Sequence, residues 1–234
     1  MFVDVLIVPA FLLAAASVSP PSPGRGISES LSNDRAGAIQ SLSYDLSFRI
    51  PPQRAEPIHG AAVVRFKLRV PRRIVLDFDQ PRDRILGVRV AGRPVDFALL
   101  DGHLIVPASA TAAGDNVIAI DFLAGDESLN RNDDFLYTLF VPARAHLAFP
   151  CFDQPDLKAR YKLTLDIPSG WQAVANGAET ARETSTAGRT VIHFAETQPL
   201  STYLFGFAAG KFSIETAERN GRTFRMFHPG NRRS

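Results

Sequence analysis

The sequence predicts an all-β fold, a β-sandwich of many short, mostly antiparallel strands with one short helix near the N-terminus. Two observations lead to this prediction. Apolar and polar residues alternate with a period of two along much of the chain after residue 41, which is the pattern of strands with one buried face. Turn-forming pairs such as Asp101-Gly102 and Asn220-Gly221 separate the short apolar runs, as they do in sheets connected by tight turns.

The N-terminal residues are mostly apolar and lead into Pro20, Pro21 and Pro23, which fits the apolar core and exit of a secretory signal peptide. The segment departs from that pattern because it has no Lys or Arg at its start and carries Asp4. A single-span anchor is the rival interpretation, but the segment is short for a bilayer, which needs about 20 apolar residues. A cytoplasmic protein with a mis-assigned start is the third. We expect a signal peptide at residues 1–19, a periplasmic or secreted protein, and no integral membrane segment after this leader.

A linker and a short helix are expected at residues 20–40. The first part of this segment is rich in Pro, Gly and Ser, which is typical of a linker. The part from Ser28 to Gln40 favours a helix. Its expected packing residues are Ile27, Leu31 and Ile39.

Two segments show the strand pattern most clearly. Residues 42–50 alternate between apolar and polar side chains, so one face of this strand is expected to be buried. Residues 64–70 alternate between apolar and basic side chains, which places Val70 in the core, and the run ends at Pro71. Further strands are expected at residues 73–78, 85–90, 95–100, 103–106, 117–123, 161–167, 172–175, 190–194, 203–207 and 223–227.

The composition limits the classes of function. A hydrophobic content of 45% indicates a globular chain, and 26 basic against 24 acidic residues leave a net charge of only +2. No overall field therefore draws the chain to nucleic acid or to a membrane surface, and we expect no nucleic-acid partner. The 17 phenylalanines supply core mass on the strands, and Phe205 and Phe207 are expected to share a face.

The segment Phe149–Ala159 reads Phe-Pro-Cys-Phe-Asp-Gln-Pro-Asp-Leu-Lys-Ala and cannot be an ordinary strand or helix. Pro150 and Pro155 each remove a backbone donor and fix φ, so the chain is expected to form a rigid loop. Cys151 is the only cysteine, which excludes an internal disulfide, and we expect it to be a buried apolar group rather than a nucleophile. Asp153 is expected to accept hydrogen bonds from nearby backbone N–H groups, with general acid/base catalysis as the alternative.

This loop and its flanks resemble the N-terminal domain of the aminopeptidase N family of zinc metallopeptidases. That family carries Phe-Pro-Cys-Phe-Asp-Glu-Pro-x-x-Lys-Ala followed by a strand, and the likeness continues in Ala173–Gly177 and Pro199–Phe212. It is strong from Phe135 to Phe212 and holds only in pattern from Ser41 to Leu129. The resemblance implies a saddle-like β domain that packs against a thermolysin-like catalytic domain, with zinc as the cofactor of the complete enzyme.

The catalytic motifs of that family are absent from this sequence. A zinc aminopeptidase needs His-Glu-x-x-His, whose spacing puts both imidazoles on one face of a helix, and none of the five histidines has it. The family's Gly-x-Met-Glu-Asn strand, whose glutamate holds the amino group of the substrate, is also missing. His193 and Glu196 lie on opposite faces of a strand, so we expect no metal site there. We therefore assign no catalytic, substrate-binding or metal-ligating residue and expect no cofactor in this chain.

One substrate contact in this family comes from the N-terminal domain, a glutamine or glutamate eight residues before the first Phe of the loop signature. Counting back from Phe149 gives Val141, which cannot hydrogen-bond an amino terminus. The same count places His146 where relatives often carry arginine. Either this branch contacts substrate differently, or the ungapped count slips between Thr138 and Leu147. No role is assigned to Val141.

Two functions remain. The first is the non-catalytic N-terminal domain of a zinc-dependent aminopeptidase, which in complete form releases N-terminal amino acids from peptides. In that case the catalytic domain is missing by truncation, peptide substrate binds only in the context of that domain, and this chain alone is inactive. The second is a stand-alone β-sandwich that binds a peptide or a protein.

The two functions differ in what they expect of the surface. A domain that has lost its neighbour should expose a large apolar patch, whereas an adapted module should be polar there. We expect residues 41–215 to form the β domain and residues 216–234 to form a terminal strand and the junction to the missing domain. The abrupt end of the alternating pattern after residue 227 favours the first function.

Overall fold

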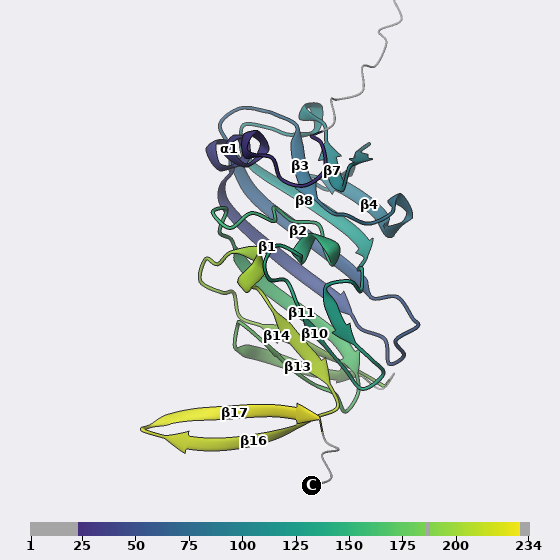
Figure 1. Cartoon of the computed structure of the whole chain (residues 1–234), viewed down its shortest axis with the longest axis vertical. Helices are drawn as coiled ribbons and strands as arrows, with labels where there is room; N and C mark the ends of the chain where they lie inside the picture. The colour runs from purple at the N-terminus through teal and green to yellow at the C-terminus, as the bar shows by residue number, and fades with distance from the viewer. Residues whose placement is uncertain (1–22, 186–187, 230–234) are drawn as a thin grey trace, which may run out of the picture.

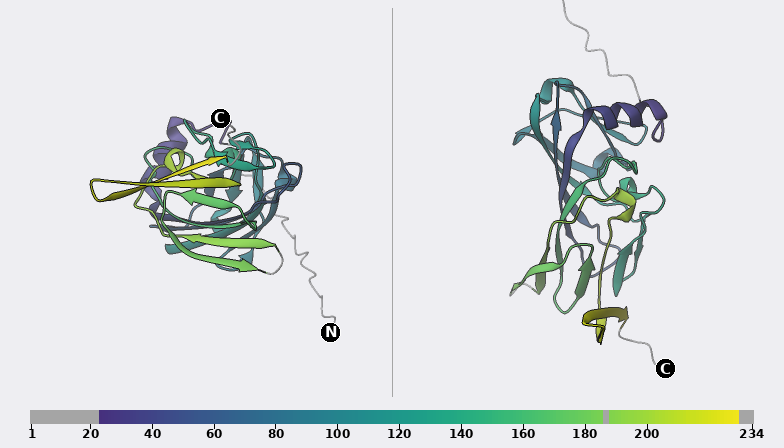
Figure 2. Two further views of the ribbon diagram at one scale, coloured as in Figure 1. Left: turned by 90° about the horizontal axis from the view of Figure 1, so that it is seen from below. Right: turned by 90° about the vertical axis from the view of Figure 1, so that its left-hand side faces the viewer.

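The computed structural model describes residues 23–185 and 188–229, so the expected signal peptide at residues 1–19 lies outside the described residues. The fold is the predicted all-β assembly, with one α-helix among the described residues (Figure 1). Eight-, four- and three-stranded sheets share one core, and a two-stranded hairpin stands at the end of the molecule opposite the helix. Figure 2 shows this hairpin projecting sideways from the sandwich.

The eight-stranded sheet has the strand order β13-β14-β11-β1-β2-β8-β4-β5, and the smaller sheets have the orders β12-β15-β10-β9 and β3-β7-β6. The strands of the large sheet are β1 (Gln40–Arg49), β2 (His59–Leu68), β4 (Ile85–Val90), β5 (Arg93–Pro94), β8 (Gly114–Leu123), β11 (Arg160–Pro168), β13 (Glu179–Ser185) and β14 (Arg189–Phe194). The smaller sheets contain β9 (Leu129–Arg131), β10 (Phe135–Thr138), β12 (Gln172–Ala175) and β15 (Phe207–Gly210), and then β3 (Ile74–Asp77), β6 (Ala98–Leu100) and β7 (His103–Val106). The hairpin consists of β16 (Phe212–Arg219) and β17 (Arg222–Pro229), and short 3-10 turns are η1 (Arg82–Arg84), η2 (Ala108–Ala110), η3 (Ala145–Leu147) and η4 (Thr202–Leu204).

The two segments with the clearest alternation form β1 and β2, which lie in the middle of the large sheet. In β1, the apolar positions from Leu42 to Phe48 are buried and the residues between them are half-buried. The strand β2 pairs along its full length with β8 and with most of β1, antiparallel in both cases. The one parallel pair among the described strands is β1 with β11, which brings together segments more than a hundred residues apart and sets the loop 149–159 against the first strand.

The helix α1 (Glu29–Ala38) lies where the sequence predicts it. Ser28 caps its start, because the Ser28 hydroxyl accepts a hydrogen bond from the N–H of Leu31 at 3.2 Å. Leu31 and Ile39 are buried as expected, and Ile27 is half-buried. The helix also buries Arg35, which its sequence pattern did not indicate.

Aromatic rings fill the space between the sheets. Tyr44 stacks on Tyr161 with ring centroids 5.0 Å apart, and Tyr161 stacks on Phe205 at 4.6 Å. Phe205 and Phe207 are both buried, with centroids 6.2 Å apart, so they share the core as expected. Edge-to-face contacts of Phe149 with Tyr44 and other rings extend the cluster, an arrangement favoured by the ring quadrupole.

Three expectations from the sequence were wrong. Val70 is 63% exposed, because β2 ends at Leu68 and the chain bends before Pro71. Residues 203–207 do not form a strand: the amide of Leu204 bonds the carbonyl of Ser201, giving the turn η4, and the strand β15 begins only at Phe207. Residues 95–100 form a strand only at their end. The strands β5, β9, β10, β13 and β16 were not predicted, and the expected boundary at residue 215 falls inside β16.

Within the described part of the chain, no helix has the length and apolar character needed to cross a membrane.

Candidate functional site

The loop 149–159 is fastened to strand β3 through Asp77. The backbone N–H of Asp77 donates to the carbonyl of Cys151 at 2.7 Å, and the N–H of Cys151 donates back at 3.1 Å. One carboxylate oxygen of Asp77 accepts from the N–H of Asp153 at 2.8 Å. The side chain of Asp77 is buried, so the loop is held by a carboxylate inside the protein.

Arg35 of helix α1 neutralises that carboxylate. Its guanidinium makes two bonds to Asp77, Nη1 to Oδ2 at 2.9 Å and Nη2 to Oδ1 at 2.5 Å, and two more to the carbonyl of Val75 at 3.1 and 2.8 Å. The guanidinium also lies over the ring of Phe152, 5.5 Å from its centroid. Burial alone would raise the pKa of Asp77, but the hydrogen bond from His103 and the charge of Arg35 outweigh it and lower the pKa. Asp77 is therefore a buried, ionised anchor.

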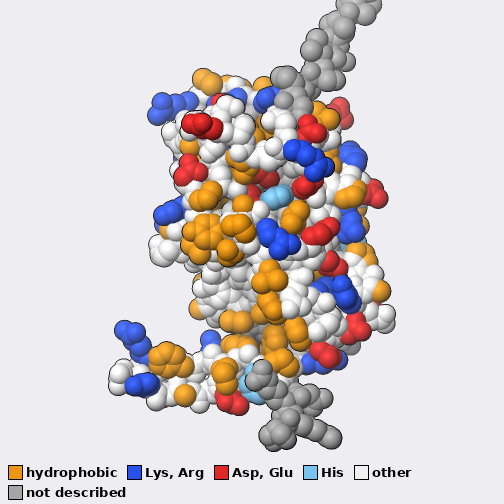
Figure 3. All heavy atoms as spheres, viewed as in Figure 1, with side chains coloured by type: hydrophobic (Ala, Val, Ile, Leu, Met, Phe, Trp, Pro, Cys, Tyr) orange, Lys and Arg blue, Asp and Glu red, His pale blue; other side chains and the backbone are white. Residues whose placement is uncertain are grey.

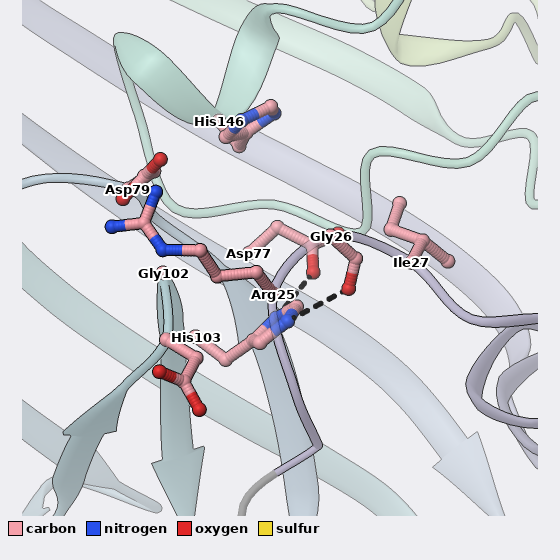
Figure 4. Close-up of a pocket in the computed structure, with 9 residues that line it drawn as sticks. Arg25, Gly26, Ile27, Asp77, Asp79, Gly102, His103 and His146 are labelled. Atoms are coloured by element: carbon pink, nitrogen blue, oxygen red, sulfur yellow. Dashed lines mark hydrogen bonds and ion pairs between the residues drawn. The ribbon is translucent and has the colours of Figure 1, made fainter.

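His103 on strand β7 completes the surroundings of Asp77. Its Nδ1 lies 2.8 Å from Asp77 Oδ1, and its Nε2 lies 3.0 Å from the carbonyl oxygens of both Gly24 and Gly26. Figure 4 shows the imidazole pointing toward Asp77 and Gly26. This side chain therefore ties the segment before α1 to the same carboxylate that holds the loop.

Asp153 in the loop makes a second polar group. Its Oδ2 accepts from the backbone N–H of His146 at 3.2 Å and lies 2.7 Å from the ring Nδ1 of the same residue, while its Oδ1 accepts from the hydroxyl of Thr202 at 2.6 Å. Asp153 thus accepts one backbone N–H, as expected, and bonds two side chains as well. Burial would lower the pKa of His146, but its hydrogen bond to Asp153 and the nearby carboxylates raise it.

A small cavity of about 110 Å³ lies beside His103 and His146 (Figure 4). Its other polar side chains are Arg25, Asp79 and Asp101, together with buried Asp77. None of the described residues that line it carries a hydroxyl or a thiol, so the lining offers nothing that a histidine could activate as a nucleophile. Two carboxylates, those of Asp77 and Asp153, connect α1, β3, η3, η4 and the loop through their hydrogen bonds.

Three other residues that the sequence analysis considered, Cys151, His193 and Glu196, lie in different parts of the fold. Cys151 is fully buried, and burial raises the pKa of its thiol well above the usual value. His193 bonds the hydroxyl of Thr164 at 3.1 Å, and Glu196 lies 3.8 Å from Arg160. Among the described residues, no group of three or more His, Cys, Asp or Glu side chains is placed to hold a metal.

An apolar face lies on the outer side of the four-stranded sheet. Cross-strand pairing sets Val174, Ala208 and Tyr137 in one row, and Tyr137 also stacks on Phe135 at 6.1 Å. Phe135 stacks in turn on Phe212 of the hairpin at 6.2 Å. Just beyond β10, Leu139 is 44% and Val141 65% exposed. Figure 3 shows hydrophobic side chains gathered along this part of the molecule. We refer to Phe135, Tyr137, Leu139, Val141, Val174 and Ala208 as the apolar face.

Sequence reasoning missed the residues that anchor the loop. Arg35 and Asp77 were interpreted only as parts of a helix and a strand, and His103 as the first residue of another strand. One indication was available for Asp77, since a carboxylate between Leu76 and Phe78 in an apolar run must be paired when the run is buried. Its partner could not have been found, because Arg35 lies 42 positions away.

Comparison with known proteins finds similarity to one family over part of the chain. Residues 126–204 match the Peptidase M1 N-terminal domain. Probable M1 family aminopeptidase 1 of Encephalitozoon cuniculi is 31% identical over 165 residues, which cover 61% of this chain and 19% of that protein. Aminopeptidase M1-B of Oryza sativa subsp. japonica is 28% identical over 204 residues, which cover 80% of this chain and 23% of that protein. The chain therefore spans about a fifth of the length of these curated relatives.

Solved structures show the same fold. The M1 zinc metallopeptidase from Deinococcus radiodurans superposes with a TM-score of 0.69 at 20% identity, over 83% of this chain and 48% of that one. The family match over residues 126–204 and the relatives agree with the resemblance carried by the loop 149–159 and support an N-terminal domain of the aminopeptidase N, or M1, type in this chain, while the solved structure shows the same fold.

Proposed function

We propose that this chain serves as the non-catalytic N-terminal domain of a zinc-dependent aminopeptidase that releases N-terminal amino acids from peptides. In this proposal the chain contributes a rigid wall beside the active site and a face on which the catalytic domain docks. Peptide substrate is bound only when that second domain is in place. The comparisons support the proposal because the relatives are named as M1 aminopeptidases and residues 126–204 match the Peptidase M1 N-terminal domain.

The observation that carries the docking role is the apolar face. Tyr137 is 38% exposed, and the exposure rises through Leu139 to Val141. Soluble monomeric proteins seldom leave contiguous apolar surface open unless a partner covers it. A partner domain that covers this face would bury the rings and aliphatic groups, worth about 25 cal/mol for each Å² removed from water. An adapted stand-alone module would instead be polar here.

The residues of this chain do not fit a zinc site. A catalytic zinc needs three protein ligands, commonly two histidines and a glutamate. The sequence has no His-Glu-x-x-His, and the described residues bring no three such side chains together. The proposal therefore assigns the metal and the reacting groups to the catalytic domain and gives this chain no step in the chemistry.

The proposed location of the protein is the periplasm or the exterior of the cell. The apolar residues at 1–19 and the prolines after them support a signal peptide and a periplasmic or secreted protein. Mass spectrometry of the mature N-terminus after expression with its native leader tests this. A start near residue 20 supports export, and an intact Met1 in the cytoplasmic fraction contradicts it.

The apolar face is tested by replacing Leu139 and Val141 together with lysine. The wild-type chain is expected to bind the dye ANS and to self-associate in sedimentation velocity, and the double variant to lose at least about half of the ANS signal. Leu86→Lys is the matched control, because Leu86 is 54% exposed but lies on the large sheet. Equal losses in both variants, or no dye binding by the wild-type chain, would contradict the docking role.

The missing catalytic groups have their own test. DNA sequence beyond the codon for Ser234 is expected to encode Gly-x-Met-Glu-Asn and His-Glu-x-x-His in some reading frame. Unrelated sequence there would favour the stand-alone binding module.

A further inference from the structure

The sandwich has two unpaired strand edges that meet at one corner. The strand β12 is the last strand of the four-stranded sheet, and β13 is the last strand of the eight-stranded sheet. Residues 176–178 connect the two. Within the described residues, neither edge has a further strand beside it. An open edge presents free N–H and C=O groups that can pair with another extended chain.

A groove of about 770 Å³ runs along this corner. Residues 172–179, which include all of β12, form one wall, and Ile214, Arg225 and Phe227 of the hairpin form the other. Phe194, which is 2% exposed, lies at the base. In Figure 1 the hairpin lies beyond the end of the sandwich that carries β13. The groove is large enough for several residues of an extended peptide.

The charges in the groove do not balance. Glu179 is bound by Arg182 through two hydrogen bonds of 2.8 Å each. The bonds from Arg182 and, to a smaller extent, the charge of Arg225 lower the pKa of Glu179. The charged side chains among the described residues that line the groove are therefore one carboxylate and two guanidinium groups. The surplus positive charge favours an occupant that carries a carboxylate.

The apolar residues of the groove are placed to contact every second side chain of an extended peptide. Ile214 is 41% exposed, and Phe227 and Val174 are half-buried on either side of the groove. A strand added beside β12 would lie about 4.8 Å from it and point every second side chain to the same side. Apolar side chains on that strand would cover Ile214 and Phe227, and a polar one would reach the arginine.

We propose that this groove binds an extended peptide segment, which pairs its backbone with the free edge of β12 and sets an acidic side chain against Arg225. The mode is β-strand addition, in which main-chain hydrogen bonds provide affinity and side-chain contacts provide selectivity. This inference does not rest on the proposed function, because β12 and the hairpin form most of the groove, and the groove shares only Val174 with the apolar face.

Fluorescence anisotropy with the full 234-residue chain tests the proposal. The probe is a fluorescein-labelled Thr-Val-Thr-Glu-Thr-Val peptide, in which Glu and both Val residues share one face of the strand, compared with the same peptide carrying Lys in place of Glu. The Glu peptide is expected to bind about tenfold more tightly, and backbone N-methylation of alternate residues is expected to abolish its binding. Arg225→Glu should reverse the preference between the Glu and Lys peptides. Arg222→Glu is the control, since Arg222 lies on the same strand but does not line the groove, and it should leave the preference unchanged.

A reversed preference also shows that the Arg225→Glu variant is folded, because an unfolded variant would bind neither the Glu peptide nor the Lys peptide. The proposal is overturned if the two peptides bind equally, if neither binds at millimolar concentration, or if Arg222→Glu has the same effect as Arg225→Glu. It is also overturned if sedimentation shows that a second copy of the chain fills the groove, with self-association lost in Arg225→Glu and no effect of added peptide.

Discussion

Asp77 and Arg35 form a two-point ion pair that is buried on both sides, with side-chain exposures of 3% and 4%, and it joins strand β3 to helix α1. A pair removed from water in this way is costly to form and weakens the fold severely when only one partner is lost. Here the same carboxylate also receives the N–H of Asp153, so the pair fixes the loop 149–159 as well as the helix. The loop that identifies the family is thus held in place by residues outside it.

Replacing Asp77 with asparagine should lower the free energy of unfolding by about 3–5 kcal/mol, because it leaves the Arg35 charge buried without a counter-charge. Urea denaturation followed by tryptophan fluorescence of Trp171 measures this. Asp79→Asn is the control: Asp79 is exposed two positions along the chain and should change stability by less than about 0.5 kcal/mol. A double variant Arg35→Met with Asp77→Asn should lose less than the sum of the single variants. Additive losses would show that the pair is not the anchor.

The two stacked tyrosines should respond in opposite ways to loss of the hydroxyl. The hydroxyl of Tyr44 accepts the N–H of Phe152 at 2.9 Å, so Tyr44→Phe should cost about 1–3 kcal/mol by leaving that donor unpaired. The hydroxyl of Tyr161 is buried and has no hydrogen-bond partner among the described residues, so Tyr161→Phe should be neutral or stabilising. Equal destabilisation by both substitutions in thermal unfolding would contradict this difference.

The pair of His146 and Asp153 predicts a dependence of stability on pH. The pKa of His146 is raised above 6.5 in the folded chain, so the pair contributes fully below that value and its contribution is lost as the pH rises through the folded pKa. The stability difference between wild type and His146→Gln should therefore be larger at about pH 5.5 than at about pH 8.5. Titration of the ring protons by NMR should give a midpoint above 6.5, and a midpoint at or below that value would count against the pair.

Two glycines should show opposite effects when each is replaced with alanine. A Cβ on Gly60 in β2 would overlap the ring of buried Phe122, so Gly60→Ala should destabilise by at least about 1–3 kcal/mol. Gly37 lies in helix α1, and a Cβ added there would meet nothing within 4 Å, so Gly37→Ala should stabilise by about 0.5–1 kcal/mol. If the urea midpoints of both variants shifted in the same direction, the packing described at Gly60 would be contradicted.

The centre of the fold was predictable from the sequence, and its edges were not. The strands β1, β2 and β8 bury one face, so their sequences alternate and the alternation located each strand, although the start of β2 and of β8 lies before the predicted residue. The edge strand β13 and the hairpin strand β16 have mostly exposed residues. A strand that is exposed to solvent on both faces does not alternate between apolar and polar residues, so its sequence does not reveal it. The short strand β10 escaped notice for a different reason, because only Leu136 in it is buried.

The candidate site was predictable only in part. The prolines of the loop 149–159 indicated a rigid segment, and Cys151 is buried as its neighbours suggested. The grouping of Arg35, Asp77 and His103 arises from packing between elements far apart in sequence, and no local pattern encodes it. The apolar face was expected only as a property of one proposed function, and its residues became identifiable once the register of β10, β15 and β12 was known.

The proposed role, in which this chain supports an aminopeptidase without supplying its chemistry, has a direct test. It is tested most directly by purifying the 234-residue chain, measuring its zinc content, and assaying hydrolysis of leucine and alanine p-nitroanilides with zinc added. We expect no stoichiometric zinc and no hydrolysis above the zinc-only blank. Stoichiometric zinc together with hydrolysis that a chelator abolishes and zinc restores would contradict it.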